Sequence, residues 1–192
     1  MGFFYEQGYG NSLAEEGMDL CFMGTNRLLV GWQENAGGLK EMAVWNVLEN
    51  NHLDYTFTKP DPNEEWERVA TGVIEDGTDY YVISVVTDAY TGKVRAGDLL
   101  FLTAFDATGV ELWEVNYPIE GIMPKDILFD PQNNNSLVVI ADRYKVGGGV
   151  RGLELLSFDT QGNINWVTTY TGHGVENVST TELVIDAKGY TT

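Results

Sequence analysis

Short apolar runs separated by turn residues recur along the chain, and they set the expected secondary structure. The runs at residues 80–86 and 137–141 are rich in β-branched and aromatic side chains, which favour β-strands. Clusters of Gly and Asn, such as Asn35-Ala36-Gly37-Gly38, separate the runs and are typical of tight turns. No amphipathic helical pattern of useful length interrupts them. The pattern therefore predicts an all-β protein built from short strands.

The apolar runs fall into cycles of four strands each. The expected strands lie at 18–23, 28–32, 42–48 and 53–57 in the first cycle, at 69–74, 80–86, 99–105 and up to Trp113 in the second, and at 127–129, 137–141, 153–158 and up to Trp166 in the third. A fourth cycle begins at 182–189, and residues 1–9 hold a further aromatic strand candidate. Four short strands per repeat of about 50 residues describe a meander, and stacked meanders are the blades of a β-propeller. The middle strands are apolar at nearly every position, which predicts that neighbouring sheets cover both of their faces.

One hairpin occurs twice in the chain. Residues 105–113 and 158–166 each read as an apolar strand, an Asp-x-x-Gly turn and a second strand that ends in Trp. Asp can bond its own turn backbone, Gly supplies a positive φ, and the flat Trp ring can pack against a neighbouring blade. We therefore assign a structural, blade-docking role to Phe105, Asp106, Gly109, Trp113, Phe158, Asp159, Gly162 and Trp166.

The residues around the first hairpin carry a family resemblance. The segment Thr103-Ala104-Phe105-Asp106-Ala107-Thr108-Gly109-Val110-Glu111-Leu112-Trp113 resembles the Ala-x-Asp-x-x-Thr-Gly-x-x-x-Trp signature of pyrroloquinoline-quinone-type (PQQ-like) propeller repeats. The wider cycle is similar to the repeats of secreted bacterial propellers, which Gly97-Asp98-Leu99-Leu100 and Tyr9-Gly10 match. The resemblance implies an all-β propeller with four-stranded antiparallel blades.

The match is specific only at residues 97–117 and 151–170. The first cycle departs from it, with Asn50-Asn51 in place of the Asp-x-x-Gly turn and Tyr55 in place of the Trp. Quinoprotein dehydrogenases bind quinone and calcium through residues that have no recognisable counterpart here, and a vicinal Cys pair is missing from the sequence. The resemblance therefore implies a scaffold, and the function must be argued from a site.

The cycles divide the chain into blades at residues 10–58, 63–117 and 120–170, with a partial blade formed by 171–192 together with 1–9. Closed propellers have 4–8 blades, so this number lies at the bottom of the range. Residues 1–9 could complete the last blade and so hide the open sheet edges. Alternatively, the chain is part of a larger propeller, or a half that pairs with a copy of itself. The pattern stops in mid-cycle, which favours the fragment.

Acidic residues dominate the charge, because 29 Asp and Glu against 11 Lys and Arg give a formal net charge of −18. Such a chain repels nucleic-acid phosphates and anionic membrane surfaces, so neither is an expected partner. The sequence holds no apolar run long enough to insert across a bilayer. Its single cysteine, Cys21, cannot form an intramolecular disulfide and lies in an apolar run, which predicts a buried, inert thiol.

Candidate catalytic and metal-binding residues are sparse. His52 and His173 are the only histidines, and neither has Cys or an acid at the spacing of a zinc site. Glu64-Glu65-Trp66-Glu67 is the densest acidic cluster and is interpreted as a solvated edge, because calcium needs five or more converging oxygens. No cofactor is expected, with calcium the one left open. The sequence also lacks a Gly-x-Ser-x-Gly nucleophile elbow, so it favours a protein that is not an enzyme.

Aromatic residues outside the docking position are the main binding candidates. They are Trp32, Trp45, Trp66, Tyr80, Tyr81, Tyr90 and Tyr144. The alternative is that most of them fill the gaps between blades. We expect a secreted or cell-surface module, extracellular or periplasmic, that binds a protein or glycan ligand at its loop face or serves adhesion or assembly. The alternative function is a quinoprotein-like or glycan-processing enzyme with its site at the propeller channel.

Overall fold

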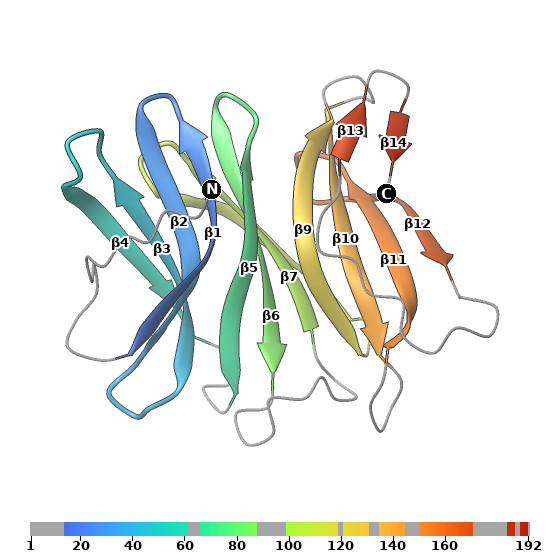
Figure 1. Cartoon of the computed structure of the whole chain (residues 1–192), viewed down its shortest axis with the longest axis horizontal. Helices are drawn as coiled ribbons and strands as arrows, with labels where there is room; N and C mark the ends of the chain where they lie inside the picture. The colour runs from blue at the N-terminus through green and yellow to red at the C-terminus, as the bar shows by residue number, and fades with distance from the viewer. Residues whose placement is uncertain are drawn as a thin grey trace.

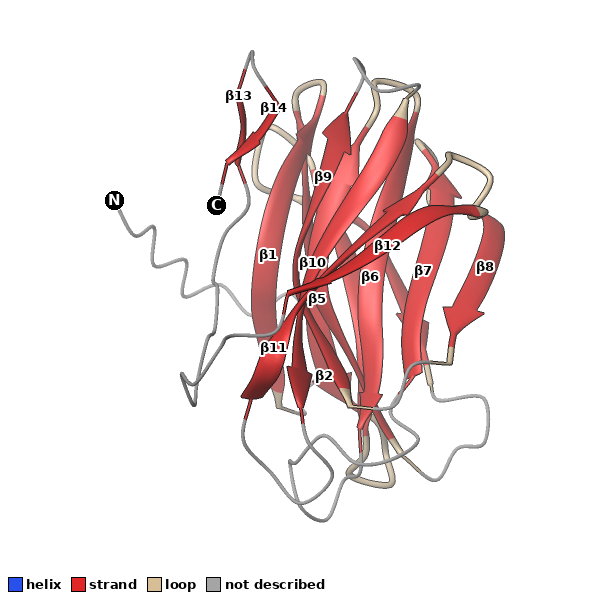
Figure 2. Cartoon of the chain, turned by 90° about the vertical axis from the view of Figure 1, so that its right-hand side faces the viewer, coloured by secondary structure: helices blue, strands red, loops and turns tan. Residues whose placement is uncertain are grey.

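The protein consists of strands and loops throughout the residues that the computed structural model describes, which are 14–60, 66–87, 99–118, 121–130, 135–144, 150–170, 184–186 and 189–191. These residues form three four-stranded antiparallel sheets and one two-stranded hairpin, with no helix among them (Figure 2). The predicted all-β class is therefore confirmed. The predictions for residues 1–9, for Glu64-Glu65 and for residues 171–183 lie outside the described residues.

Each sheet is a meander in which consecutive strands pair. Sheet A contains β1 (Glu15–Met23), β2 (Asn26–Glu34), β3 (Lys40–Val47) and β4 (Leu53–Lys59). Sheet B contains β5 (Glu67–Glu75), β6 (Asp79–Thr87), β7 (Leu99–Asp106) and β8 (Glu111–Tyr117). Sheet C contains β9 (Ile122–Asp130), β10 (Ser136–Tyr144), β11 (Val150–Phe158) and β12 (Ile164–Tyr170). The short hairpin of β13 (Val184–Asp186) and β14 (Gly189–Thr191) follows, and β13 contacts β9.

The three sheets stand side by side in chain order, with sheet B between the other two (Figure 1). Their first strands meet, since β1 contacts β5 and β5 contacts β9. The core between sheets A and B consists of Cys21, Leu28, Val30, Met42, Val44, Ala70, Val73, Tyr80, Val82 and Phe105. The core between sheets B and C consists of Tyr81, Ile83, Leu100, Leu102, Ala104, Ile122, Ile127, Leu137, Val139, Ala141, Leu156 and Phe158. Consecutive residues of β6 thus enter opposite cores, which explains why the middle strands are apolar on both faces.

The two Asp-x-x-Gly turns have the same hydrogen bonds. Asp106 Oδ1 accepts the N–H groups of Thr108 and Val110 at 2.8 and 3.0 Å, and the Gly109 N–H donates to the Asp106 carbonyl. Asp159 makes the equivalent bonds in the second turn, where Gly162 takes the place of Gly109. Both glycines have a positive φ, 84° and 83°, a backbone conformation that side chains with a Cβ rarely adopt.

An aromatic ring of one sheet lies against the turn glycine of the next sheet. A Cβ atom on Gly162 would stand 2.8 Å from the Trp113 ring, and one on Gly109 would stand 2.6 Å from the Tyr55 ring. Tyr55 therefore occupies in sheet A the position that Trp113 occupies in sheet B. We call this the aromatic-on-glycine contact. Because glycine has no Cβ atom, the ring can lie closer to the turn backbone than it could if any other residue occupied that position.

The corresponding turn of sheet A has Asn51 at the glycine position. Its N–H donates to the Leu48 carbonyl, in the same pattern as Gly109 and Asp106, and its φ is also positive at 65°. The Asn51 side chain accepts a hydrogen bond from Arg27 Nη1 at 2.8 Å. Sheet A therefore contributes Tyr55 to the contact with sheet B. Its own turn has the Asn51 side chain at the position where the other two turns have a glycine.

The remaining residues of the predicted docking set lie in or against the cores. Phe105 stacks on Tyr80 with ring centroids 5.0 Å apart, and Phe158 meets Tyr117 edge-on. Trp166 is half-buried and packs with Val138, Ile140 and Leu155 on the face of sheet C that is turned away from sheet B.

Replacing the turn glycines tests the aromatic-on-glycine contact. Gly77 also has a positive φ, 97°, but a Cβ there would meet nothing within 4 Å, so Gly77→Ala is a matched control. We expect the control to cost about 1–2 kcal/mol through backbone conformation alone. Gly162→Ala should cost about 1–3 kcal/mol more, because the new methyl group collides with Trp113. Urea unfolding measures both.

The double variant Trp113→Ala, Gly162→Ala separates the collision from other effects. Removing the indole should abolish most of the additional cost of Gly162→Ala, leaving only the contact with Val115 Cγ1 at 3.0 Å, so the two substitutions should be strongly non-additive. Equal losses in Gly77→Ala and Gly162→Ala would show that the ring contributes nothing at this glycine.

Candidate functional site

The meander order places two kinds of connection at opposite ends of the sheets. The two Asp-x-x-Gly turns lie at one end, and the 35–39 turn, Pro60 and Trp66 lie at the other. We call the latter the loop end, which is the lower end in Figure 1. Connections between rigid strands are the usual position of binding residues.

A groove opens at the loop end between sheets A and B. It encloses about 330 Å³ and is lined by Asn35, Gly37, Leu39, Lys40, Glu41, Pro60 and Trp66. All but Trp66 belong to sheet A or its connections, and Trp66 directly precedes β5 of sheet B. Asn35 holds the turn closed, because its Oδ1 accepts the N–H groups of Gly37 and Leu39 at 2.8 and 3.1 Å. Its Nδ2 donates to Glu41 Oε1 at 3.0 Å, which fixes the carboxylate.

Lys40 connects the groove to both sheets. Its Nζ lies 4.3 Å from the centre of the Trp32 ring, within the range of a cation–π interaction. The same atom is 3.9 Å from Glu67 Oε2 at the start of β5. Trp32 is in turn oriented by a hydrogen bond from its Nε1 to Glu16 Oε2 at 3.1 Å. The ammonium group therefore lies close to residues of both sheets.

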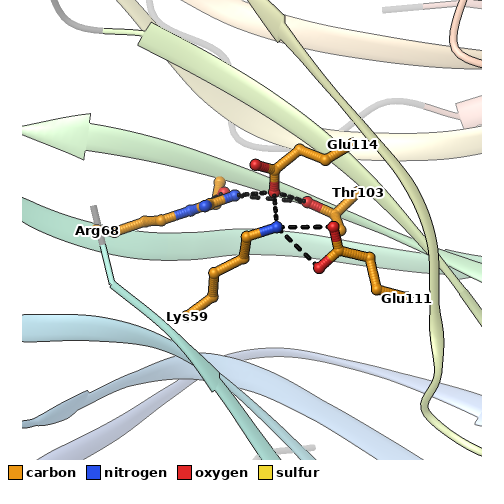
Figure 3. A network of polar contacts seen from close by, with 6 residues as sticks. Lys59, Arg68, Thr103, Glu111 and Glu114 are labelled. Carbon is orange, nitrogen blue, oxygen red and sulfur yellow. Dashed lines mark hydrogen bonds and ion pairs between the residues drawn. The ribbon is translucent and has the colours of Figure 1, made fainter. Parts of the chain in front are cut away.

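A cluster of charged and hydroxyl groups joins sheets A and B (Figure 3). In the sequence, two of its members are close to the groove residues Pro60 and Trp66. Arg68 is fully buried, and its Nη2 lies 2.7 Å from Glu114 Oε2. Lys59, at the end of β4, reaches from sheet A with its Nζ 2.8 Å from Oε2 of both Glu111 and Glu114. The Thr103 hydroxyl donates to Glu114 at 2.8 Å. We call Lys59, Arg68, Thr103, Glu111 and Glu114 the charge cluster.

The charge cluster has no counterpart in sheet C. The strand register shows which positions of sheets B and C are equivalent. Arg68 pairs with Val86 in sheet B, and Ile122 pairs with Arg143 at the equivalent place in sheet C. Thr103 pairs with Glu114 in sheet B, and the equivalent pair in sheet C is Leu156 and Val167. Ile122 and Leu156 belong to the apolar core between sheets B and C. The same positions therefore carry charge in one interface and hydrocarbon in the other, so the two interfaces are chemically different.

The electrostatics of Glu114 follow from this environment. Burial by itself raises the pKa of a carboxyl group, but the hydrogen bond and positive charge of Arg68, with hydrogen bonds from Lys59 and Thr103, outweigh it. The pKa of Glu114 therefore lies below its ordinary value, and the carboxylate stays ionised at neutral pH. The groups that donate hydrogen bonds to the Glu114 carboxylate all belong to the protein, which fits a structural role better than proton transfer.

The predicted buried thiol is confirmed. Cys21 is 8% exposed in the core between sheets A and B, and burial, followed by the negative charges of Asp19 and Glu75, raises its pKa to about 12. The thiolate that would act as a nucleophile is therefore not formed at neutral pH. In the same core, the Tyr55 and Tyr80 hydroxyl groups lie 3.1 Å apart.

The aromatic binding candidates separate into two groups. Trp45, Tyr80 and Tyr81 are at most 3% exposed. Tyr80 and Tyr81 fill the cores between sheets, in agreement with the gap-filling interpretation, whereas Trp45 packs with Ala43, Val47 and Leu29 on the face of sheet A turned away from sheet B. Trp66 lines the groove and Trp32 supports Lys40. Tyr144 is half-buried at the end of β10, and Tyr90 lies outside the described residues. In the described part of the chain, no group of three or more His, Cys, Asp and Glu side chains is arranged to hold a metal ion.

The turn at residues 35–38 was predicted from the sequence, but its place beside a groove and the charge cluster were not. One signal was available, because aligning the two hairpins sets Thr103 against Leu156 and Glu114 against Val167. A polar pair that replaces an apolar pair at equivalent strand positions indicates a buried polar partner. That partner, Arg68, comes from a strand distant in sequence, and only the structure brings it to them.

Comparisons with known proteins add no family. No protein-family model matches the sequence, and a search of curated proteins found no match. Within the residues that the structure describes, no helix is long and apolar enough to cross a membrane.

The charge cluster gives a prediction about stability with a matched control. Glu114→Ala removes the partner of buried Arg68 and should lower the free energy of unfolding by about 3–5 kcal/mol. Glu111→Ala removes a more exposed partner of Lys59 and should cost about 0–1 kcal/mol. Urea unfolding of both variants measures the difference. Similar losses in the two variants would contradict the structural role assigned to Glu114.

Acid titration provides an independent test. The folded-state pKa of Glu114 lies below the ordinary value of 4.5, so its ionised form stabilises the fold above that pH. This contribution is lost as the pH falls through the lower folded-state value. Between about pH 5 and pH 3, stability should therefore fall more steeply in the parent than in Glu114→Ala. Parallel curves would show that Glu114 has the same pKa in the folded and unfolded chain.

Proposed function

We propose that this chain is a propeller-like, non-enzymatic binding module, and that the groove between sheets A and B holds its ligand. Three features support the propeller-like assignment. The sheets are four-stranded meanders, they stack through their first strands, and the aromatic-on-glycine contact recurs between successive sheets. The β13–β14 hairpin beside β9 is the position where a fourth sheet of such a stack would begin.

The stack needs further sheets to close into a ring. Leu20 and Phe22 of β1 are 46% and 60% exposed, and their strand partners Leu29 and Arg27 lie on the face of sheet A turned away from sheet B. Large exposed apolar side chains gathered on one sheet face are typical of surfaces that another body covers. We assign that role to the remainder of a longer chain or to a second copy, as part of an extracellular or periplasmic assembly.

The single observation that carries the binding function is the pre-arranged groove. Its lining comes from sheet A and its connections together with Trp66 before β5, its turn is closed by Asn35, and the Lys40 ammonium lies over the Trp32 ring and near Glu67. Ligand sites are concave, largely pre-formed and equipped with a few oriented polar groups. The groove combines these properties with one large aromatic residue, Trp66.

The ionisable groups beside the groove already interact with other groups of the protein, and this favours binding over catalysis. Lys40 is placed beside Glu67, and Glu41 accepts a hydrogen bond from Asn35. General acid–base catalysis needs a group that can exchange its proton with the substrate at the working pH. The ionisable groups beside this groove instead contact groups of the protein itself. An enzyme of the quinoprotein or glycan-processing kind remains the alternative that a turnover assay addresses.

The experiment that tests the function uses Trp66→Ala and a matched aromatic control. Tyr170→Ala removes an exposed aromatic side chain, 55% exposed, from the outer strand of sheet C, away from the groove. Immobilised glycans and peptides are screened with the parent, and the best binder is titrated with each variant. We expect Trp66→Ala to weaken binding by about tenfold or more, as for a buried aromatic anchor, and Tyr170→Ala to leave it unchanged.

Two results would contradict the proposal. One is a ligand whose affinity is unaffected by Trp66→Ala, since its site would lie elsewhere. The other is chemical conversion of the bound glycan, or quinone-dependent oxidation of a substrate, which would favour the enzyme. Thermal unfolding of Trp66→Ala confirms beforehand that the variant is folded.

A further inference from the structure

The outer strand of sheet C, β12, forms an edge of its sheet. It pairs with β11 on one side, and no other described strand pairs with it on the other. The outward N–H and C=O groups of such an edge strand can bond to a strand of another molecule. We infer that this molecule is a second copy of the chain, with the two β12 strands paired antiparallel about a two-fold axis at Thr168. The inference does not depend on the ligand of the groove.

The absence of charge distinguishes β12 from the outer strands of the other two sheets. The outer strand of sheet A, β4, contains Asp54 and Lys59. In sheet B, β8 contains Glu111 and Glu114. By contrast, β12 has no charged residue, and the uncharged stretch extends over residues 160–172. Charged side chains on edge strands oppose pairing between molecules, so the edge of sheet C lacks a protection that the other two edges have.

The side chains of β12 suit pairing with another strand. Ile164, Val167 and Tyr170 are large apolar residues that are exposed on this strand. Most residues of β12 are β-branched or aromatic, the types that favour strands. The carboxylate of Glu154, which lies opposite β12 in the register with β11, is buried and 2.9 Å from Arg143 Nη1. It therefore adds no exposed charge beside the edge.

The position of the axis follows from a bulge near the start of β12. The pairing with β11 shifts between Ile164 and Trp166, so Asn165 is left out of the ladder and the regular part of the strand is 166–170. Thr168 is the central residue of this regular part. A two-fold axis at Thr168 therefore pairs the regular part with its own copy along its whole length, without involving the bulge.

In this register the strand is complementary to itself. Trp166 lies opposite Tyr170 of the second copy, and the symmetry forms this aromatic pair twice. Val167 lies opposite Thr169, which pairs two β-branched residues. Thr168 lies opposite its own copy, where the two hydroxyl groups can exchange a hydrogen bond. Cross-strand pairs of these kinds stabilise antiparallel sheets, and a peptide of unrelated sequence would not supply all of them.

The edge of β12 is also separate from the surfaces by which sheets stack. The sheets stack face to face and meet at their first strands, whereas β12 is the last strand of its sheet (Figure 1). A further sheet beside sheet C would cover a face and leave the outer edge open. The contact therefore differs from the cover that we assign to the exposed face of sheet A at Leu20 and Phe22.

The test is sedimentation equilibrium of the whole chain, at about 0.15 M salt to screen the repulsion between two acidic copies. The parent should dimerise as its concentration rises. Thr168→Lys places two ammonium groups opposite each other and should weaken the dimer about fivefold or more. Thr56→Lys is the matched control, because it makes the same change of charge at an exposed threonine on the outer strand of sheet A. It should leave the dimer unchanged.

A mixture of two variants tests the axis itself. Thr168→Glu, like Thr168→Lys, should associate weakly alone, because two carboxylates then lie opposite each other. An equimolar mixture of the two variants should dimerise at least as well as the parent, since an ammonium group then lies opposite a carboxylate. This recovery requires residue 168 of one copy to lie opposite residue 168 of the other. Thermal unfolding confirms that both variants are folded.

Four results would overturn the inference. The first is a parent that stays monomeric up to about 1 mM. The second is a dimer that Thr168→Lys does not weaken, or a mixture that shows no recovery. The third is a dimer that Phe22→Asp abolishes, because the second copy would then lie on the face of sheet A. The fourth is a monomer that binds extended peptides of unrelated sequence at β12, because the partner would then be a peptide.

Discussion

The aromatic-on-glycine contact is the constraint on which the arrangement of the sheets depends. A large ring on the outer strand of one sheet lies directly on the turn backbone of the next, which is achievable because Gly109 and Gly162 have no Cβ. The same glycines close their turns with a positive φ, so one residue type meets a local and a long-range requirement. With the outer strands joined in this way and the first strands in contact, the spacing between sheets A and B is set. The same spacing sets the geometry of the groove at their loop end.

Sheet A differs from the other sheets in the residue at the glycine position of its turn. Its turn has the hydrogen bonds of the Asp-x-x-Gly turns, but Asn51 stands in the glycine position and is bonded to Arg27. A ring placed there as Trp113 is placed on Gly162 would collide with the Asn51 side chain. Tyr55 faces sheet B and contacts Gly109, so sheet A provides an aromatic residue for this contact without receiving one in the same way.

The charge cluster makes the interface between sheets A and B unlike the interface between sheets B and C. Hydrophobic residues at the same positions in sheet C show that stacking does not require charge there. Buried ion pairs contribute little net stability, but they penalise any arrangement that leaves Arg68 unpaired. We therefore interpret the cluster as a device that specifies which sheets pair. By tying Lys59 to Glu111 and Glu114, it also holds the end of β4 against sheet B beside the groove.

The sequence by itself determined the strands, the Asp-x-x-Gly turns and the burial of the middle strands, because these depend on residue types and on alternation along short segments. Only the tertiary structure decided which side chains meet between sheets. Simple alternation places Arg68 and Val73 on opposite faces of β5, yet both face sheet A, because the register shifts between Ala70 and Gly72. A bulge of one residue turns Arg68 toward Glu114 and reverses the face assigned to every residue before it. Trp66 and the 35–41 turn likewise come together only when the two sheets pack, since no local pattern links them.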